Sequence, residues 1–115
     1  MCTGSPAVGE RAGAITRAHV VAPRGELDLY SVEAVRAALA ERPAACEVVV
    51  LDLRGLTFFD TSGIRLVVET LQELTAAGLR FALLRGEPDV QRLFALTGLE
   101  HRLPFFDELD GALAG

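Results

Sequence analysis

The chain has 115 residues, of which half are hydrophobic and 23% are charged. This length fits one domain with its own core, and the composition excludes an intrinsically disordered chain, which combines low hydrophobicity with high net charge. The net charge of −5 and the absence of basic runs argue against binding to nucleic acid or to an anionic membrane surface. No apolar run approaches the ~18 residues of a membrane span, and the start of the chain lacks the pattern of a signal peptide.

All 11 basic residues are arginine, so Schiff-base chemistry and a Walker-type phosphate loop, which both need lysine, are excluded. The two cysteines, Cys2 and Cys46, match neither a disulfide framework nor a zinc pattern. The two histidines, His19 and His101, have no other ligand residues beside them in the sequence. We therefore expect a reduced, cytoplasmic domain that carries no metal and no cofactor.

The first half of the chain divides into an arm and the start of a domain. Residues 1–13 are rich in Gly, Ser, Pro and Ala, which predicts a flexible N-terminal arm that precedes a domain over residues 14–115. Three elements are expected next, and each has a local signal. They are a loosely alternating strand over residues 15–21, a helix that Ser31 caps and Pro43 ends, and a continuous apolar strand over residues 47–53 with both faces covered.

The second half alternates in the same way. Apolar residues at helical spacing predict a helix from Thr61 to just before Gly78, which suits the position after a helix end. The remaining expected elements have weaker signals: a strand over residues 80–84, a helix from Pro88 to Gly98, a short strand over residues 103–106, and a final helix through Leu113 capped by Asp107. Strands that alternate with helices through short connections predict an α/β domain.

The segment over residues 52–64 is the place where function is most strongly indicated. A buried strand ends there, a short turn follows, and a helix opens with the hydroxyls of Thr61 and Ser62. Free backbone N–H groups and the positive end of the helix dipole suit an anion, including a phosphate group on a hydroxyl. The same residue types are also common helix caps. From the residues alone, capping and modification both remain open.

Two enzymatic interpretations of this segment are disfavoured. Asp60-Thr61-Ser62-Gly63 is similar to the Asp-Thr-Gly of aspartic proteases, but the serine interrupts that motif and the segment runs directly into a helix. A nucleophilic serine would need a base and an oxyanion hole, and neither a Gly-x-Ser-x-Gly motif nor a linked histidine is present. We expect no enzymatic activity, and a small hydrolase is the weakest of the functional hypotheses.

Three motifs in the correct order resemble the STAS-domain family, and within it the bacterial anti-sigma-factor antagonists. They are Gly-Glu-Leu-Asp at residues 25–28, the strand, apolar turn and Asp-Thr-Ser-Gly at residues 53–63, and Val-Gln-Arg-Leu-Phe-Ala-Leu-Thr-Gly-Leu at residues 90–99. The resemblance covers residues 14–114. It implies a single small STAS-like α/β domain, with a central mixed sheet of about four to five strands and helices mainly on one face. The first strand of the family is poorly represented, because residues 1–13 lack strand character.

The resemblance also implies a partner switch. The unphosphorylated protein would bind an anti-sigma factor that is a serine/threonine kinase, so that a sigma factor is freed. Phosphorylation of the hydroxyl after the motif aspartate, Asp60, would end binding, and a protein phosphatase would reverse it. By position the acceptor is Thr61, with Ser62 as the neighbouring hydroxyl. No nucleic acid or membrane contact is implied, and the protein is expected to be a monomer or weak dimer.

The partner-facing surface is expected at the start of the Thr61 helix and the turn near Asp28. Two positions depart from the family pattern: the acceptor is threonine, where serine is commoner, and Ile64-Arg65 replaces Leu-Gly. Arg65 either meets an acidic partner, blocks kinase docking, or pairs with Glu69 four residues on. The alternative function is a STAS module that binds without phosphorylation, as a scaffold in a stress-signalling complex or as the cytosolic part of a lipid or anion transporter. The expected partner-binding residues are Asp28, Ser31, Asp60, Thr61, Ser62, Gly63, Arg65 and Glu69.

Overall fold

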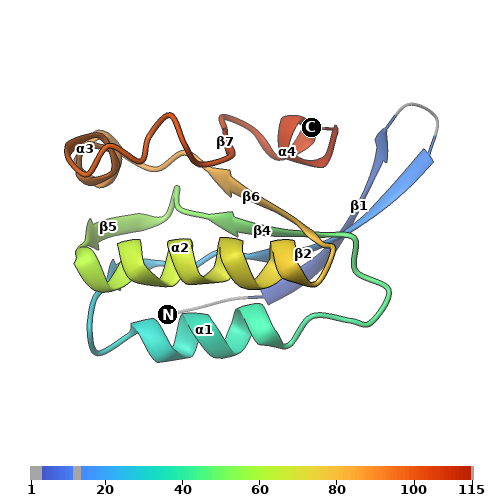
Figure 1. Cartoon of the computed structure of the whole chain (residues 1–115), viewed down its shortest axis with the longest axis horizontal. Coiled ribbons are helices and arrows are strands. Elements are labelled where there is room, and N and C mark those ends of the chain that lie inside the picture. Colours follow the sequence, from blue (N-terminus) through green and yellow to red (C-terminus); the bar gives the residue numbers. More distant parts are fainter. Residues whose placement is uncertain (1–3, 12–13, 115) are drawn as a thin grey trace.

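A mixed five-stranded sheet forms the centre of the molecule in the computed structural model (Figure 1). The structure describes residues 4–11 and 14–114, with side chains from Arg17 onward. The elements in chain order are β1 (Gly4–Arg11), β2 (Ala14–Val21), β3 (Gly25–Leu27), α1 (Val32–Ala40), β4 (Val48–Asp52), β5 (Leu56–Phe59), α2 (Thr61–Ala76), β6 (Arg80–Leu84), α3 (Pro88–Leu96), β7 (Phe105–Phe106) and α4 (Leu109–Ala114).

The main sheet has the strand order β1-β2-β4-β6-β7. β1 pairs antiparallel with β2, and the other neighbours pair in parallel. A separate two-stranded parallel sheet joins β3 to β5. The predicted α/β class with a mixed sheet of four to five strands is confirmed.

The central strand β4 has apolar residues on both faces, because helices cover both sides of the sheet. Val49 and Leu51 belong to the larger core, which also contains buried residues of α1, α2 and α3. Val48 and Val50 belong to a smaller core on the opposite face, together with Ala112 and Leu113 of α4. Three helices therefore share one face and only the short α4 covers the other, which confirms helices mainly on one face.

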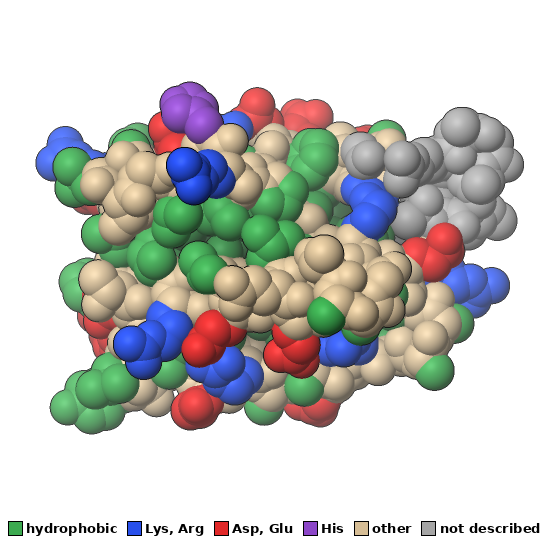
Figure 2. Space-filling view, in the orientation of Figure 1, with side chains coloured by type: hydrophobic (Ala, Val, Ile, Leu, Met, Phe, Trp, Pro, Cys, Tyr) green, Lys and Arg blue, Asp and Glu red, His purple; other side chains and the backbone are tan. Residues whose placement is uncertain are grey.

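The helices α1 and α2 lie side by side on the larger core, and both begin where the parallel strands end (Figure 1). Two parallel strands need a crossover connection between them, which is usually a helix that runs back along the sheet. The helix therefore starts near the end of the strand that precedes it. Charged side chains of both signs gather over these two helices (Figure 2). The carboxyl ends of parallel strands are the usual location of sites in open α/β folds.

The N-terminal segment contradicts one expectation. Gly4–Arg11 forms strand β1, in register with all of β2, so the view that residues 1–13 lack strand character was wrong there. Its Gly, Ser, Pro and Ala residues have low strand propensity, and the pairing partner supplies what local propensity does not. Pro6 is compatible with this position because β1 is an edge strand. The flexibility of the segment stays a prediction, and residues 1–3 and 12–13 lie outside the described part.

The remaining expected elements are present within two residues of their predicted bounds, and the other differences concern capping. Ser31 occupies the N-cap position of α1, but its side chain makes no capping hydrogen bond. Asp107 precedes α4, and its carboxylate accepts a hydrogen bond from Arg85 Nε at 3.0 Å. The strands β3 and β5 were not predicted, because three or four residues carry too little periodicity. Within the described ranges, none of the helices combines the length and the hydrophobicity that a membrane span requires.

Candidate functional site

The small β3–β5 sheet brings two sequence motifs together. Residues 25–28 and 53–63 are separated by 24 residues in the chain, yet Gly25 N donates to Gly55 O at 3.1 Å and Thr57 Oγ1 donates to Gly25 O at 3.1 Å. At the other end of the pairing, Asp60 N donates to Leu27 O at 3.3 Å. The start of α2 is therefore fixed beside the loop that leads into α1.

Asp60 caps α2. Its backbone is extended, with φ −125° and ψ −171°, and its Oδ1 atom accepts a hydrogen bond from Ser62 N at 2.9 Å. Because Asp60 performs this role, the next two residues are not needed as caps. The hydroxyls of Thr61 and Ser62 make no hydrogen bond within the part of the chain that the structure describes. Thr61 is exposed and Ser62 is half-buried. The capping explanation therefore applies to Asp60 and leaves both hydroxyls available.

Gly63 is the residue of the same turn that packs against the core. It is buried, and a Cβ atom added there would lie within 3 Å of three atoms of the Phe59 ring. Phe59 is itself buried against Phe94, with ring centroids 5.1 Å apart. The absence of a side chain at Gly63 lets the first turn of α2 approach this aromatic pair closely.

The loop before α1 contains a second aspartate and hydroxyl, and both are engaged. Asp28 Oδ1 accepts hydrogen bonds from Tyr30 N and Ser31 N, each at 3.0 Å. Ser31 Oγ accepts from Asp28 N at 3.0 Å and donates to Glu26 O at 2.8 Å. These bonds fold the loop and leave the side chains of Leu29 and Tyr30 outside, 69% and 93% exposed.

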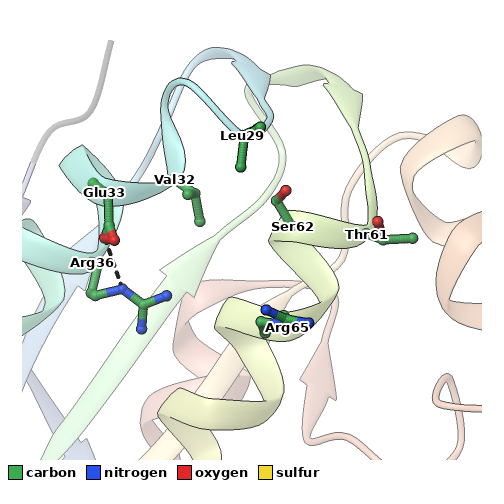
Figure 3. A pocket seen from close by; sticks show the side chains of 7 residues that line it. All are labelled: Leu29, Val32, Glu33, Arg36, Thr61, Ser62 and Arg65. Atoms are coloured by element: carbon green, nitrogen blue, oxygen red, sulfur yellow. Dashed lines mark hydrogen bonds and ion pairs between the residues drawn. The ribbon is translucent and has the colours of Figure 1, made fainter.

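A groove of about 380 Å³ separates the starts of the two helices (Figure 3). Its walls come from the loop before α1, from α1 itself and from the first turns of α2. Apolar residues line it near the loop, the two hydroxyls lie at the beginning of α2, and charged residues lie further along the helices. The lining residues are Leu29, Val32, Glu33, Arg36, Thr61, Ser62 and Arg65.

The two arginines of the groove are in different electrostatic situations. Arg36 Nε donates to Glu33 Oε2 at 3.0 Å, and Arg36 Nη1 lies 3.2 Å from Glu69 Oε1. Burial acts to lower the pKa of Arg36, but the hydrogen bonds and charges of Glu33 and Glu69 outweigh it, so that the pKa is raised. Arg65 makes no ion pair or side-chain hydrogen bond with any described residue. The suggested pairing of Arg65 with Glu69 is therefore wrong: the Glu69 carboxylate is held by Arg36 across the helix interface.

The expected site residues occupy three environments. Thr61, Ser62 and Arg65 line the groove. Asp60 and Gly63 shape the turn beneath it, and Asp28 and Ser31 hold the neighbouring loop. Glu69 belongs to the ion-pair group of α1 and α2.

Sequence reasoning missed four residues that complete this surface. Leu29 and Tyr30 are exposed hydrophobic residues directly after Gly-Glu-Leu-Asp, and an apolar pair in a turn is the signal that could have found them. Glu33 and Arg36 have the i, i+3 spacing of a helix ion pair, which was also visible. The link from Arg36 to Glu69 had no sequence signal, because it joins residues of different helices.

The other candidate residues have structural roles. His19 is buried, and its Nε2 atom lies 2.8 Å from Ala38 O, so the ring joins β2 to α1. Burial raises the pKa of the Cys46 thiol, which contacts Val48 O at 3.2 Å. Among the residues with described positions, no three His, Cys, Asp or Glu side chains form a cluster that could hold a metal ion.

A comparison with known families identifies the family of this chain. The STAS domain family model matches residues 11–112, which is most of the chain. The chain belongs to the STAS domain family. The motifs at residues 25–28, 53–63 and 90–99 all fall within this match.

Individual relatives of this STAS domain are anti-sigma factor antagonists. An anti-sigma F factor antagonist of Lysinibacillus sphaericus is 35% identical over 77 residues, covering 65% of this chain and 66% of that protein. An anti-sigma F factor antagonist of Paenibacillus polymyxa is 31% identical over 96 residues, covering 82% of each. Among solved structures, the unphosphorylated anti-sigma factor antagonist SpoIIAA matches with a TM-score of 0.68 and 27% identity, over 95% of this chain and 90% of that one. The phosphorylated form of Bacillus SpoIIAA matches with a TM-score of 0.64 and 26% identity, over 95% and 94%.

Proposed function

We propose that this STAS domain is an anti-sigma factor antagonist controlled by phosphorylation. In its unphosphorylated form it binds an anti-sigma factor that is also a serine/threonine kinase, and the sigma factor held by that kinase is released. The kinase then transfers the γ-phosphoryl group of ATP to the hydroxyl oxygen of Thr61, ADP leaves, and the hydroxyl proton is lost. A protein phosphatase removes the phosphate again, and all of these steps belong to the cytoplasm.

One observation carries this proposal: the start of α2 presents two hydroxyls that the fold does not use. Asp60 already caps the helix, and the groove beside Thr61 and Ser62 is open to a partner. The greater exposure of Thr61 favours it over the half-buried Ser62 as the acceptor. The two relatives that are anti-sigma F factor antagonists support the role, and SpoIIAA, which has the same fold, exists in unphosphorylated and phosphorylated forms.

The proposed surface has the composition of a protein interface. Leu29 lines the groove together with the two hydroxyl residues, and both Leu29 and the adjacent Tyr30 are exposed, so the loop offers apolar area to a partner. Tyrosine is frequent among the residues that dominate binding energy. Asp28 and Ser31 act indirectly here, because their hydrogen bonds hold the loop that presents these two side chains.

Phosphorylation provides a sufficient free-energy change for release. A phosphate group adds about −1.5 to −2 charges and three acceptor oxygens. An interface closed over a neutral hydroxyl would then have to bury an added negative group beside the Asp60 carboxylate, at a cost of several kcal/mol. Because a factor of ten in affinity corresponds to about 1.4 kcal/mol, this cost is enough to separate the partners without any change of fold.

The direct experiment uses the purified chain, ATP and a candidate anti-sigma-factor kinase from the same organism. Fragment mass spectrometry is expected to place the phosphate on Thr61. Phosphate on Ser62 would keep the switch and move the acceptor. No incorporation, with a kinase that phosphorylates another substrate, would contradict the switch and favour the alternative of a STAS module that binds without phosphorylation.

Binding to the same kinase separates the two states. We expect Thr61→Ala to stay bound in the presence of ATP, and Thr61→Glu to bind at least about tenfold more weakly than wild type, because a charge replaces the hydroxyl. Thr75→Glu is the matched control: it makes the same substitution at an exposed threonine near the other end of α2, and it should bind like wild type. Equal affinity of the Ala and Glu variants of Thr61 would contradict this mechanism.

A further inference from the structure

The groove beside the hydroxyls contains one arginine whose charge the fold does not neutralise. Arg36 is shared between Glu33 and Glu69, and it therefore has little capacity for a further anion. Arg65 lines the same groove, is exposed, and has no acidic partner among the residues that are described. An unpaired guanidinium is notable in a chain with a net charge of −5.

The position of Arg65 on α2 places it close to both hydroxyls. It follows Thr61 by four residues and Ser62 by three, and residues three and four apart are neighbours on a helix surface, about 5–6 Å apart at Cβ. Figure 3 shows Arg65 one turn along α2 from both hydroxyl residues. A long arginine side chain spans this separation, and its planar guanidinium can bind phosphate oxygens in a bidentate manner.

We propose that Arg65 is an internal receptor for the phosphate group: once Thr61 is phosphorylated, the Arg65 guanidinium pairs with the phosphate of its own helix. This inference rests on the proposed function, because it concerns the phosphorylated form. It adds a regulatory role for a residue that the unmodified domain leaves without a partner. The same pairing is within reach from Ser62, so the role does not depend on which hydroxyl accepts the phosphate.

The pairing has a consequence for partner release. In the unmodified protein the Arg65 guanidinium is available to a carboxylate of the partner. In the phosphorylated protein the phosphate occupies it from within the chain. Phosphorylation then acts twice on the groove, since it adds a negative group and withdraws the one uncompensated cation among the described groove residues.

The other charged groups near the phosphate are carboxylates, apart from Arg36. Asp60 precedes the acceptor on the same turn, and Glu33 faces the groove from α1. Glu69 lies further along α2 and Asp28 lies in the loop before α1, where its Oδ1 atom is already hydrogen-bonded. These carboxylates disfavour the dianionic phosphate, and Arg36 is neutralised by two of them. Of the charged groups in the groove, Arg65 is thus the one that favours the dianion.

The test measures the phosphate itself and needs no kinase. Phosphothreonine is incorporated at residue 61 of the full chain by genetic code expansion, and its titration is followed by phosphorus NMR. We expect the second pKa of the phosphate to be about half a unit lower with Arg65 present than in Arg65→Gln. Arg65→Lys should restore part of the difference, because it keeps the charge and loses the bidentate geometry. The Arg65 Nε–Hε resonance should move at the same pH as the phosphorus signal.

A charge-matched control and two outcomes decide the matter. Arg17→Gln removes one positive charge on β2, outside the groove, and should leave the phosphate titration unchanged. Identical titrations of wild type and Arg65→Gln, with a stationary Arg65 resonance, would overturn the pairing. Failure of the proposed function would be seen in a different experiment: an active anti-sigma-factor kinase would incorporate no phosphate into the chain. A kinase that phosphorylates Thr61 while the titrations coincide would keep the switch and remove only the role of Arg65.

Discussion

The starts of α1 and α2 use the same kinds of residue for different purposes. In each, an aspartate side chain accepts at least one hydrogen bond from a backbone N–H group, and a hydroxyl residue lies close by. In the first, Ser31 Oγ is bound to Asp28 N and Glu26 O, and the hydroxyl is part of the fold. In the second, Asp60 alone caps the helix, and the hydroxyls of Thr61 and Ser62 make no hydrogen bond to any residue that the structure describes. A hydroxyl at a helix start is thus available for chemistry only when another group satisfies the backbone.

The two helix starts also differ in which of their positions are buried. At the first helical position α1 buries Val32, whereas α2 exposes Thr61. At the third position α1 exposes Ala34, whereas α2 buries Gly63 against Phe59. The first turn of α2 is therefore packed tightly against the core at Gly63 and exposed to solvent at Thr61. This combination suits a modification site, because the exposed hydroxyl is held in a fixed position.

The largest expected effect tests this tight fit. Gly63→Ala should lower the free energy of unfolding by about 1–3 kcal/mol, because the new methyl group would overlap the buried Phe59 ring. That cost exceeds the roughly 1 kcal/mol that alanine gains over glycine inside a helix. Gly111→Ala in α4 is the control, since its methyl group would meet a Phe106 ring carbon at an ordinary 3.7 Å. Urea denaturation measures both, and equal stability of the two variants would refute the tight fit.

The next effect compares the hydroxyls directly. Ser31→Ala should cost about 1 kcal/mol, because Asp28 N loses its acceptor and Glu26 O loses a donor. Thr61→Ala should change stability by less than about 0.5 kcal/mol, as expected for an exposed side chain that makes no hydrogen bond. The same denaturation measurement applies. A loss at Thr61 as large as that at Ser31 would remove the distinction between a used and an available hydroxyl.

The smallest effect concerns the ion pairs that link the two helices. Arg36→Gln should cost less than about 1 kcal/mol, because Arg36 is 42% exposed and its partners Glu33 and Glu69 are 71% and 48% exposed. Comparison of stability at 0.05 M and about 1 M salt provides the check, since salt screens exposed charges. The difference between wild type and variant should shrink at high salt. A difference that persists unchanged would show that packing of the arginine stem, and not charge, joins α1 to α2.

The elements with strong local patterns could be predicted from the amino-acid sequence alone. The apolar run of β4, the stripe of α2 and the stop at Pro43 each lie within one segment, so periodicity and propensity were sufficient. The position of Thr61 and Ser62 at a helix start was predictable for the same reason. The three motifs that resemble STAS domains also lie in continuous segments, and the family model match bears out that resemblance.

The way in which these segments meet follows from long-range contacts that no local pattern reveals. Strand β1 exists through its pairing with β2, because its composition gives no local signal. The β3–β5 pairing places Leu27 beside Asp60, and the α1–α2 interface gives Glu69 to Arg36, so that Arg65 is left without a partner in the described structure. Each of these outcomes depends on contacts between residues far apart in the chain, where competing partners are chosen by geometry and not by local pattern. That choice is what separates a structural hydroxyl from an available one in this protein.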